Sequence, residues 1–250
     1  MKKTIIKTAD LRKNYTTGDS DVQVIKNLNV EFYQGEFSVI MGNSGSGKST
    51  LLYLLSGLDN ISAGKIWLND ESIHEKSEKW LALLRRKKIG FVFQDHNLIP
   101  NLSLIENILL AGYLLEENRK IIYNRALKIM EDLEIESLAN RLPAQVSGGE
   151  RQRCAIARAL INKPLVLLAD EPTGSLNSAA SVKALDCLKK LHAAGQTIIM
   201  VTHDLKTACY GDRISFFRDG QIVDDLYFDN EKQTGARESL LFNWLKEKGW

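Results

Sequence analysis

Uninterrupted apolar runs mark the chain at residues 89–93, 165–169 and 197–201. Strands that are covered on both faces show such runs, because a parallel sheet carries helices on each side. Helix-like segments lie between the runs, which is the alternation expected of a parallel sheet. The pattern therefore predicts an α/β fold of the nucleotide-binding type, with ligands bound at the carboxyl ends of the strands.

The beginning of the chain differs, since its predicted strands are short and are separated by turn residues. A turn at residues 16–20 joins the first two strands. A polar, helix-prone segment covers residues 71–88, and a tight Asp219-Gly220 turn predicts a hairpin near the end. The predicted strands outside the three central runs are residues 4–6, 22–25, 28–32, 37–41, 62–68, 214–217 and 221–223.

Residues 101–160 are predicted to be largely helical, with a break at Pro143 and a last helix at 154–161. Apolar residues recur there at helical spacing, first from Leu102 to Leu109 and again from Ile121 to Leu133. This segment falls between two predicted strands of the parallel sheet. It is therefore expected to be an inserted helical region.

The tail of the chain, residues 240–250, reads as an amphipathic helix. Leu240, Leu241, Trp244 and Leu245 fall on one face of it. We expect this face to pack onto the protein's own domain, and the alternative is a surface for a partner.

A phosphate-binding loop pattern follows the apolar run at residues 37–41 and precedes a helix-like run at 50–55. Its glycines let backbone N–H groups point inward, and the helix that follows adds partial positive charge. Lys48 is expected to reach the β- and γ-phosphates, and the Ser49 hydroxyl to ligate Mg²⁺. The alternative is a glycine-rich turn that opens an ordinary helix. The predicted nucleotide-binding residues here are Gly42, Asn43, Ser44, Gly45, Ser46, Gly47, Lys48, Ser49 and Thr50.

Composition narrows the range of partners. The chain has 250 residues, 44% of them hydrophobic and 26% charged, and a formal net charge of +2. These values are ordinary for a globular protein, and the balanced charge gives no argument for a nucleic-acid partner, so none is expected. The basic run at residues 85–88 is interpreted as a solvated helix end favoured by the helix dipole, and the alternative is contact with nucleic acid or lipid.

Cysteine spacing and the absence of long apolar segments indicate the compartment in which the protein is expected. Cys154, Cys187 and Cys209 lie far apart, which favours a reducing interior over a disulfide framework or a zinc site. The N-terminus turns polar by Lys7 and lacks the apolar core of a signal peptide. No apolar run approaches the ~20 residues of a membrane-spanning helix. If the protein works at a membrane, another subunit is expected to cross it.

Polar side chains follow the ends of the three central strands. Asp170 closes one strand and is expected to reach the Mg²⁺ held by Ser49, and Glu171 is placed to act as general base toward water. The alternative is that the two acids cap the next helix. Gln94 is a candidate for positioning the metal or the water. His203 is a candidate partner of the γ-phosphate, although such a histidine is more often structural.

A second glycine-rich helix start, Ser147-Gly148-Gly149, lies about a hundred residues after the phosphate loop and forms another candidate anion-binding N-terminus. With the phosphate loop, Gln94, the acid pair and His203 in this order, nearly the whole chain resembles the ABC ATPases. This resemblance implies a P-loop NTPase core with a parallel sheet, an N-terminal antiparallel β subdomain and an inserted α-helical subdomain. It implies one domain at residues 1–230, with the helical part at about 95–160, and a tail at 231–250.

The resemblance also assigns roles. It implies ATP and Mg²⁺ as cofactors, and a head-to-tail homodimer in which Ser147, Gly148 and Gly149 meet the ATP of the partner subunit. Tyr15, which otherwise reads as a half-buried strand aromatic, is assigned to adenine stacking. Gln94 is assigned to sensing, His203 to the γ-phosphate switch, and residues 175–177 to the loop that crosses to the partner. Asn177 stands where the family usually has Asp, and Val146 and Glu150 are milder departures.

Within the family, the chain looks like the subgroup that serves lipoprotein release, macrolide efflux and bacitracin or lantibiotic resistance. The segments that carry this likeness are residues 56–59, 81–94, 97–100 and 170–175, and the tail looks most like the antimicrobial-peptide resistance branch. The resemblance implies an FtsX-like permease as partner and a peripheral position at the cytoplasmic face of the membrane. The alternatives are cell-division regulation with such a permease, a non-transport ABC ATPase, and a nucleotide-dependent scaffold.

Overall fold

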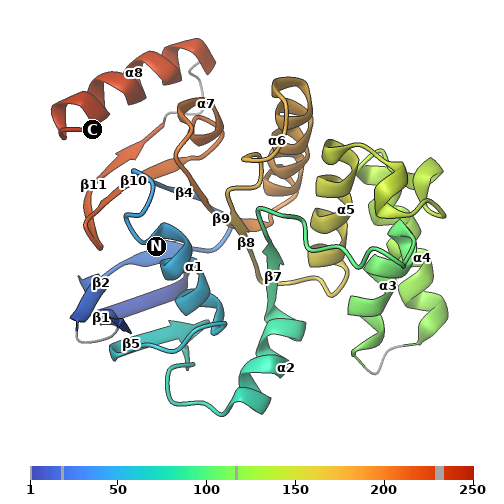
Figure 1. Ribbon diagram of the computed structural model, residues 1–250, viewed down its shortest axis with the longest axis horizontal. Helices are drawn as coiled ribbons and strands as arrows, with labels where there is room; N and C mark the ends of the chain where they lie inside the picture. Colours follow the sequence, from blue (N-terminus) through green and yellow to red (C-terminus); the bar gives the residue numbers. More distant parts are fainter. Residues whose placement is uncertain (1, 18–19, 116–117, 229–233) are drawn as a thin grey trace.

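A computed structural model describes residues 2–17, 20–115, 118–228 and 234–250 (Figure 1). Its centre is a six-stranded sheet in the order β11-β10-β4-β9-β8-β7. All neighbouring strands in it are parallel except β11, which pairs antiparallel with β10. The strands of this sheet are β4 (Phe37–Met41), β7 (Ile89–Val92), β8 (Val166–Asp170), β9 (Thr197–Thr202), β10 (Arg213–Arg218) and β11 (Gln221–Tyr227).

A second, antiparallel sheet is built from the beginning of the chain. Strand β1 lies at its centre and pairs with β2, β3 and β5, and β6 pairs with β5. The strands of this sheet are β1 (Thr4–Thr17), β2 (Ser20–Leu28), β3 (Glu31–Tyr33), β5 (Ala63–Leu68) and β6 (Glu71–Ser72). The predicted α/β class with an N-terminal antiparallel part is therefore confirmed.

The helices connect the strands or follow them along the chain. Helix α1 follows β4, α2 precedes β7, and α3 to α5 are inserted between β7 and β8, on the right of Figure 1. Two 3₁₀ turns, Glu136–Leu138 and Pro143–Gln145, break the inserted segment. The helices are α1 (Lys48–Ser56), α2 (Glu78–Lys88), α3 (Leu104–Tyr113), α4 (Arg119–Asp132), α5 (Gly148–Leu160), α6 (Ser178–Ala193), α7 (Leu205–Ala208) and α8 (Thr234–Glu247).

Several predicted elements differ in the structure. The first strand, expected at residues 4–6, extends over Thr4–Thr17, and the tail helix expected at 240–250 spans Thr234–Glu247. The single strand expected at residues 28–32 is broken, because the Thr8 hydroxyl donates to the Leu28 carbonyl and accepts from the Val30 N–H in place of a strand partner. The helix expected over residues 71–88 begins only at Glu78, after a Ser77 cap, since Glu71–Ser72 pairs with β5. The helix expected at 154–161 begins at Gly148, directly after Ser147.

Strands β4, β8 and β9 are buried throughout because they separate two cores. In β8, Leu167 and Ala169 face one core while Val166 and Leu168 face the other. The first core contains the inserted helices, and the second contains α1 and the antiparallel sheet. Alternate side chains of a strand point to opposite faces, so both sets are buried.

Helix α8 packs on the parallel sheet through Leu241 and Leu245, which are fully buried. The Trp244 ring meets Phe216 edge-on at 6.3 Å between centroids. The boundary expected at residues 230 and 231, and residues 18 and 19 of the turn expected at 16–20, lie outside the described residues. In the described part of the chain, no helix combines the length and apolar character that crossing a membrane requires.

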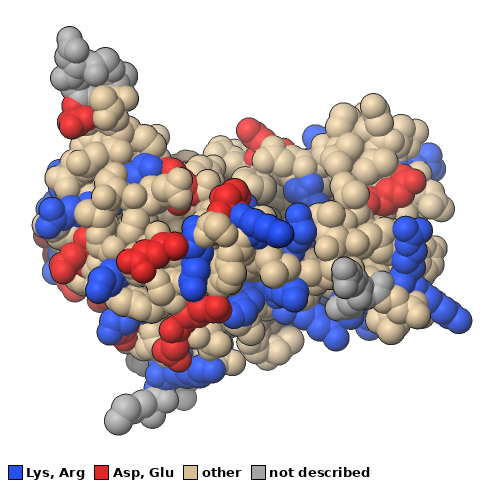
Figure 2. All heavy atoms as spheres, turned by 90° about the horizontal axis from the view of Figure 1, so that it is seen from below, with Lys and Arg blue, Asp and Glu red and all other residues tan. Residues whose placement is uncertain are grey.

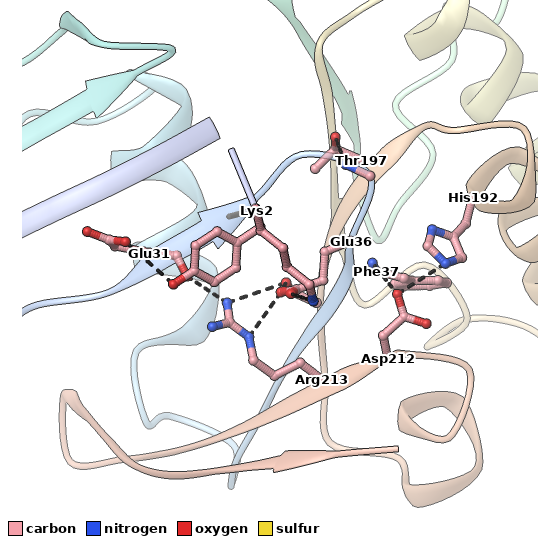
Figure 3. A network of polar contacts seen from close by, with 11 residues as sticks. Lys2, Glu31, Glu36, Phe37, His192, Thr197, Asp212 and Arg213 are labelled. Atoms are coloured by element: carbon pink, nitrogen blue, oxygen red, sulfur yellow. Dashed lines mark hydrogen bonds and ion pairs between the residues drawn. The ribbon is translucent and has the colours of Figure 1, made fainter. Parts of the chain in front are cut away.

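An ion network joins the two sheets at the amino ends of β4 and β10 (Figure 3). Arg213 and Glu36 are 4% and 3% exposed, and their Nε and Oε1 atoms lie 3.1 Å apart. Arg213 also donates from Nη2 to the Glu31 carbonyl of β3 at 2.7 Å. Lys2 reaches the other Glu36 oxygen at 3.2 Å. One guanidinium thus bridges the parallel and the antiparallel sheet.

Replacing Arg213 with Met should destabilise the protein by roughly 3 kcal/mol, because the Glu36 carboxylate then remains buried with only Lys2 as counter-ion. Chemical denaturation measures this loss. The double variant Glu36→Gln/Arg213→Met removes both charges and should be more stable than the single variant. A double variant that is less stable than Arg213→Met would contradict this account of the pair.

Candidate nucleotide site

The phosphate loop leaves the carboxyl end of β4 and enters α1, and only glycine fits at several of its positions. A side chain on Gly42 would place its Cβ 2.0 Å from the Phe217 carbonyl oxygen. Gly45 and Gly47 have φ values of +77° and +102°, in the left-handed region that favours glycine. The loop therefore keeps a fixed curled backbone at the sheet edge.

Lys48 is 5% exposed and its ammonium group lies within the loop, where it donates to the Gly42 and Asn43 carbonyls at 2.8 Å each. Burial lowers the pKa of Lys48, while Glu171 and Asp170 act in the opposite direction. The Ser46 hydroxyl is also buried there, with no hydrogen-bond partner in the described part of the chain. A cation and an orphaned hydroxyl in one loop fit a phosphate ligand.

Ser49 and Asp170 meet at the sheet edge, where the Ser49 hydroxyl donates to Asp170 Oδ1 at 2.7 Å. Asp170 is 4% exposed, and burial raises its pKa against the hydrogen bonds from Ser49 and Tyr53. A hydroxyl and a carboxylate are oxygen ligands of the kind that Mg²⁺ takes. This donor set fits the predicted magnesium site.

Glu171 and His203 also come together, with Oε2 and Nδ1 3.0 Å apart. The Glu171 backbone has a φ of +42°, an uncommon conformation for a residue with a side chain, and its N–H donates to the Val201 carbonyl. Both residues line a cavity of about 460 Å³ between α6 and α7. The acid pair does not cap α6, whose N-cap is Asn177.

Gln94 lies beside the loop that follows Glu171. Its side-chain nitrogen would be 3.1 Å from a Cβ on Gly174, and its carbonyl accepts from the Ser175 hydroxyl at 3.4 Å. Gln94 is therefore brought next to Glu171. Among the described residues, Gln94 forms no hydrogen bond with Ser49 or Asp170.

The second glycine-rich start opens α5. The Ser147 hydroxyl donates to Glu150 and accepts from the Glu150 N–H, which forms a capping box. Gly149 has no room for a side chain, since its Cβ would lie 2.8 Å from the Ala180 Cβ. Ser147 is exposed, and in Figure 1 strands β8 and β9 separate α5 from α1. The two anion-binding helix starts of one chain are thus apart.

Tyr15 lies on β1 and is 38% exposed. Its hydroxyl donates to Asp59 at 2.6 Å, and the Lys13 ammonium lies 4.6 Å from its ring centroid. An exposed, hydrogen-bonded ring is compatible with both interpretations from the sequence, a strand aromatic and a platform for a purine.

Asn177, the departure from the family pattern, is exposed and caps α6 by accepting the Ala180 N–H at 2.9 Å. Asn and Asp are about equally good N-caps. The exchange therefore keeps the cap and removes only the negative charge.

Sequence reasoning missed the residues that attach the Gln94 loop to α5. Arg158 donates from Nη2 to the His96 carbonyl at 2.7 Å and from Nη1 to the Asn97 carbonyl. His96 and Asn97 are both left-handed, with φ of +62° and +47°. Burial lowers the pKa of His96, whose ring also interacts with the Gly148 backbone. Helical spacing could place Arg158 on α5 but could not identify its partners.

Comparison with known proteins decides the family. A family model described as ABC transporter matches residues 25–174, more than half of the chain. The chain belongs to the ABC transporter ATPases. It is thus an ATP-hydrolysing subunit of a transporter, and its phosphate loop, acid pair and Ser147 lie within the matched range.

This ABC ATPase is 42% identical over 226 residues to the uncharacterized ABC transporter ATP-binding protein MJ0796 of Methanocaldococcus jannaschii, covering 87% of this chain and 95% of that one. It is 40% identical to the ABC transporter ATP-binding protein YxdL of Bacillus subtilis, covering 94% and 92%. It is 38% identical to the macrolide export ATP-binding/permease protein MacB of Hyphomonas neptunium, covering 97% of this chain but 37% of MacB.

Solved structures agree with the family. A dimeric structure of MJ0796 superposes with a TM-score of 0.84 at 39% identity, covering 90% of this chain and all of that one. A second dimeric structure, described as a post-hydrolysis state of MJ0796 bound to ADP and Pi, superposes with a TM-score of 0.83 at 38% identity over the same shares. The fold of this ABC ATPase is therefore that of an ATP-binding cassette.

The variant Asp170→Asn should be more stable than the natural protein without nucleotide. The folded pKa of Asp170 is raised, so the ionised carboxylate lowers stability at pH 7, and the penalty fades as pH falls through the folded pKa toward 3.8. Thermal unfolding in EDTA at pH 7 and pH 5 measures the gain, which should be larger at pH 7. The matched control Asp59→Asn should lose stability at pH 7, because hydrogen bonds from Lys13 and Tyr15 outweigh desolvation and lower that pKa. A less stable Asp170→Asn protein would contradict the assignment.

Proposed function

We propose that this ABC ATPase acts as a head-to-tail homodimer that encloses two Mg·ATP and drives an FtsX-like permease. We place it at the cytoplasmic face of the membrane, held there by the permease. The proposed task is export of, or resistance to, antimicrobial peptides of the bacitracin or lantibiotic type. Lipoprotein release, macrolide efflux and cell-division regulation remain the alternatives for such a permease.

The observation that carries the dimer is the separation of the two anion-binding helix starts. The Ser147 start is exposed and is separated from the phosphate loop of its own chain by β8 and β9 (Figure 1). A triphosphate bound at Lys48 therefore meets a Ser147 start only if a second chain supplies it. Solved structures of MJ0796 are described as dimeric, which supports a dimer for this chain.

Each site residue is then assigned a role in binding Mg·ATP. Loop N–H groups and Lys48 bind and orient the β- and γ-phosphates. Ser49 and Asp170 would hold Mg²⁺, with Gln94 as a third candidate ligand. Bound Mg²⁺ supplies positive charge to the phosphate oxygens. Tyr15 stacks on the adenine ring.

Glu171 is the proposed general base. Its carboxylate accepts a proton from the attacking water as the new bond to the γ-phosphorus forms and the bond to ADP breaks. His203, 3.0 Å from Glu171, keeps the carboxylate in place and then contacts the γ-phosphate. Since Glu171 sits on a left-handed backbone, its position depends on the contacts of the adjoining loop.

A groove between α2, β7 and α3 supports a permease partner. It has a volume of about 340 Å³, an apolar part that includes Leu58, Phe91 and Leu114, and basic side chains that include Arg86 and Arg158. Leu58 and Leu114 are 44% and 51% exposed. An amphipathic segment with acidic residues would fit this groove. It would lie next to the loop that carries Gln94, because Phe93 also lines the groove.

Replacing Glu171 with Gln should lower ATP hydrolysis by about 10²–10⁴-fold, because the amide cannot accept the proton. The variant should accumulate as an ATP-bound dimer, measured by light scattering after size exclusion. Lys48→Ala in the same background should abolish the dimer, since it deletes the charge on the phosphates. Unaltered turnover in Glu171→Gln would remove Glu171 from this role, and an ATP-bound monomer would refute the dimer.

Replacing Leu114 with Glu should weaken stimulation of hydrolysis by the permease by roughly tenfold or more, because it puts a charge on an apolar contact. The measurement is the ratio of hydrolysis with and without reconstituted permease. Leu110→Glu is the matched control, since Leu110 lies on α3, of which Leu114 is the C-cap, is 44% exposed and does not line the groove. Equal ratios for both variants would refute the groove as the docking site.

A further inference from the structure

A cavity of about 490 Å³ lies between α5 and α6, which run side by side in Figure 1 and are in direct contact. It shares no lining residue with the phosphate loop or with the Glu171–His203 cavity. Its charged lining consists of Arg153, Lys183, Lys189, Lys190, Glu134 and Asp186. Cations therefore outnumber acids by two.

Arg153 is a buried cation of this cavity without a hydrogen-bond partner among the described residues. It is 8% exposed, and its Nε atom is buried without a hydrogen-bond acceptor in the described part of the chain. No hydrogen bond or ion pair to a described residue is formed by its other nitrogens. Burial of an N–H group without an acceptor is costly, so an anion that accepts from the Arg153 Nε–H would stabilise it.

The acids in the cavity are already engaged. Glu134 pairs with Lys190 at 3.5 Å, and Asp186 accepts from the Tyr210 hydroxyl at 3.4 Å. Glu150, whose pKa Arg153 and Lys183 both help to lower, is held by the Ser147 hydroxyl and N–H. Among the described residues, none forms an ion pair with Lys183. Arg153 and Lys183 are thus two cations of this lining that form no ion pair with a described residue.

We propose that this cavity binds a small phosphate-class oxyanion, held by Arg153 and Lys183. The planar fork of Arg matches the spacing of phosphate oxygens, and the flexible Lys183 ammonium can close over a ligand from α6. The excess of two positive charges in the lining matches a doubly charged anion. Figure 2 shows basic and acidic side chains interspersed on the face that it draws, whereas the cavity lining has two more cations than acids.

Arg153 lies about one helical turn beyond Gly149, near the start of α5. Arg153 Nη1 is 3.7 Å from where a Gly149 Cβ would be, at the closest approach of α5 to Ala180 of α6. An anion there would bind both helices and fix their spacing. This binding inference does not depend on the homodimer or on the permease.

The test uses the full chain with Lys48→Ala, so that phosphate binding at the loop is weakened. Inorganic phosphate should raise the thermal midpoint in a saturable manner, compared with chloride at equal ionic strength. Glycerol 3-phosphate forms the second arm, and the tighter of the two ligands identifies a free phosphate or a headgroup as the source. No saturable rise with either ligand would overturn the proposal.

Two variants locate the site. Lys183→Gln, an exposed change on α6 that leaves the fold intact, should weaken the apparent affinity about tenfold. Arg153→Gln should abolish the rise, and if that protein fails to fold, Lys183→Gln still decides. Lys120→Gln on α4 is the charge-matched control and should bind as before. Equal affinities in the Lys183→Gln and Lys120→Gln proteins would refute the site.

Cys187 gives an independent local measurement, because it lines the cavity and is 5% exposed. Saturating phosphate should slow its alkylation by iodoacetamide several-fold, read by mass spectrometry of the peptide. Cys154 and Cys209 are buried elsewhere and provide the internal control for global opening. An unchanged Cys187 rate at a phosphate concentration that raises the thermal midpoint would place the anion outside this cavity and refute the proposal.

Discussion

Two-sided burial of strands β4, β8 and β9 is the constraint on which the molecule depends. Each strand has one set of side chains in the core that contains the inserted helices and the other set in the core that contains α1. Polar side chains along such strands would have no water on either face. Chemistry can therefore appear only where a strand ends, as it does at Gly42, Asp170 and His203.

The sequence was a sufficient guide to the fold class and to most elements. Continuous apolar runs predicted the parallel strands, and the order of motifs identified the family, both of which are confirmed. The wrongly predicted element bounds arose where a local contact competed with the expected helix or strand. The Thr8 side chain interrupts the strand expected at residues 28–32, and the pairing of Glu71–Ser72 with β5 shortens the helix expected after it.

The residues of the candidate site that belong to a sequence motif could be predicted. Residues that act through contacts between segments far apart in the sequence could not. The motifs gave Lys48, Ser49, Asp170, Glu171 and His203, and the structure adds the contacts of Ser49 with Asp170 and of Glu171 with His203. Arg158 and Arg153 had no such signal, because each looks like one of many cations on a helix. The roles of these residues in ATP hydrolysis stay predictions.

The first core is continuous from the inserted helices to one face of the parallel sheet. Inner side chains of the inserted helices therefore belong to the same apolar cluster as Leu167 and Met200 of the sheet. A shift of these helices has to slide over interdigitated apolar surface, which resists gradual drift and favours a few discrete positions. The packing itself thus limits the inserted helices to a small number of stable positions relative to the sheet.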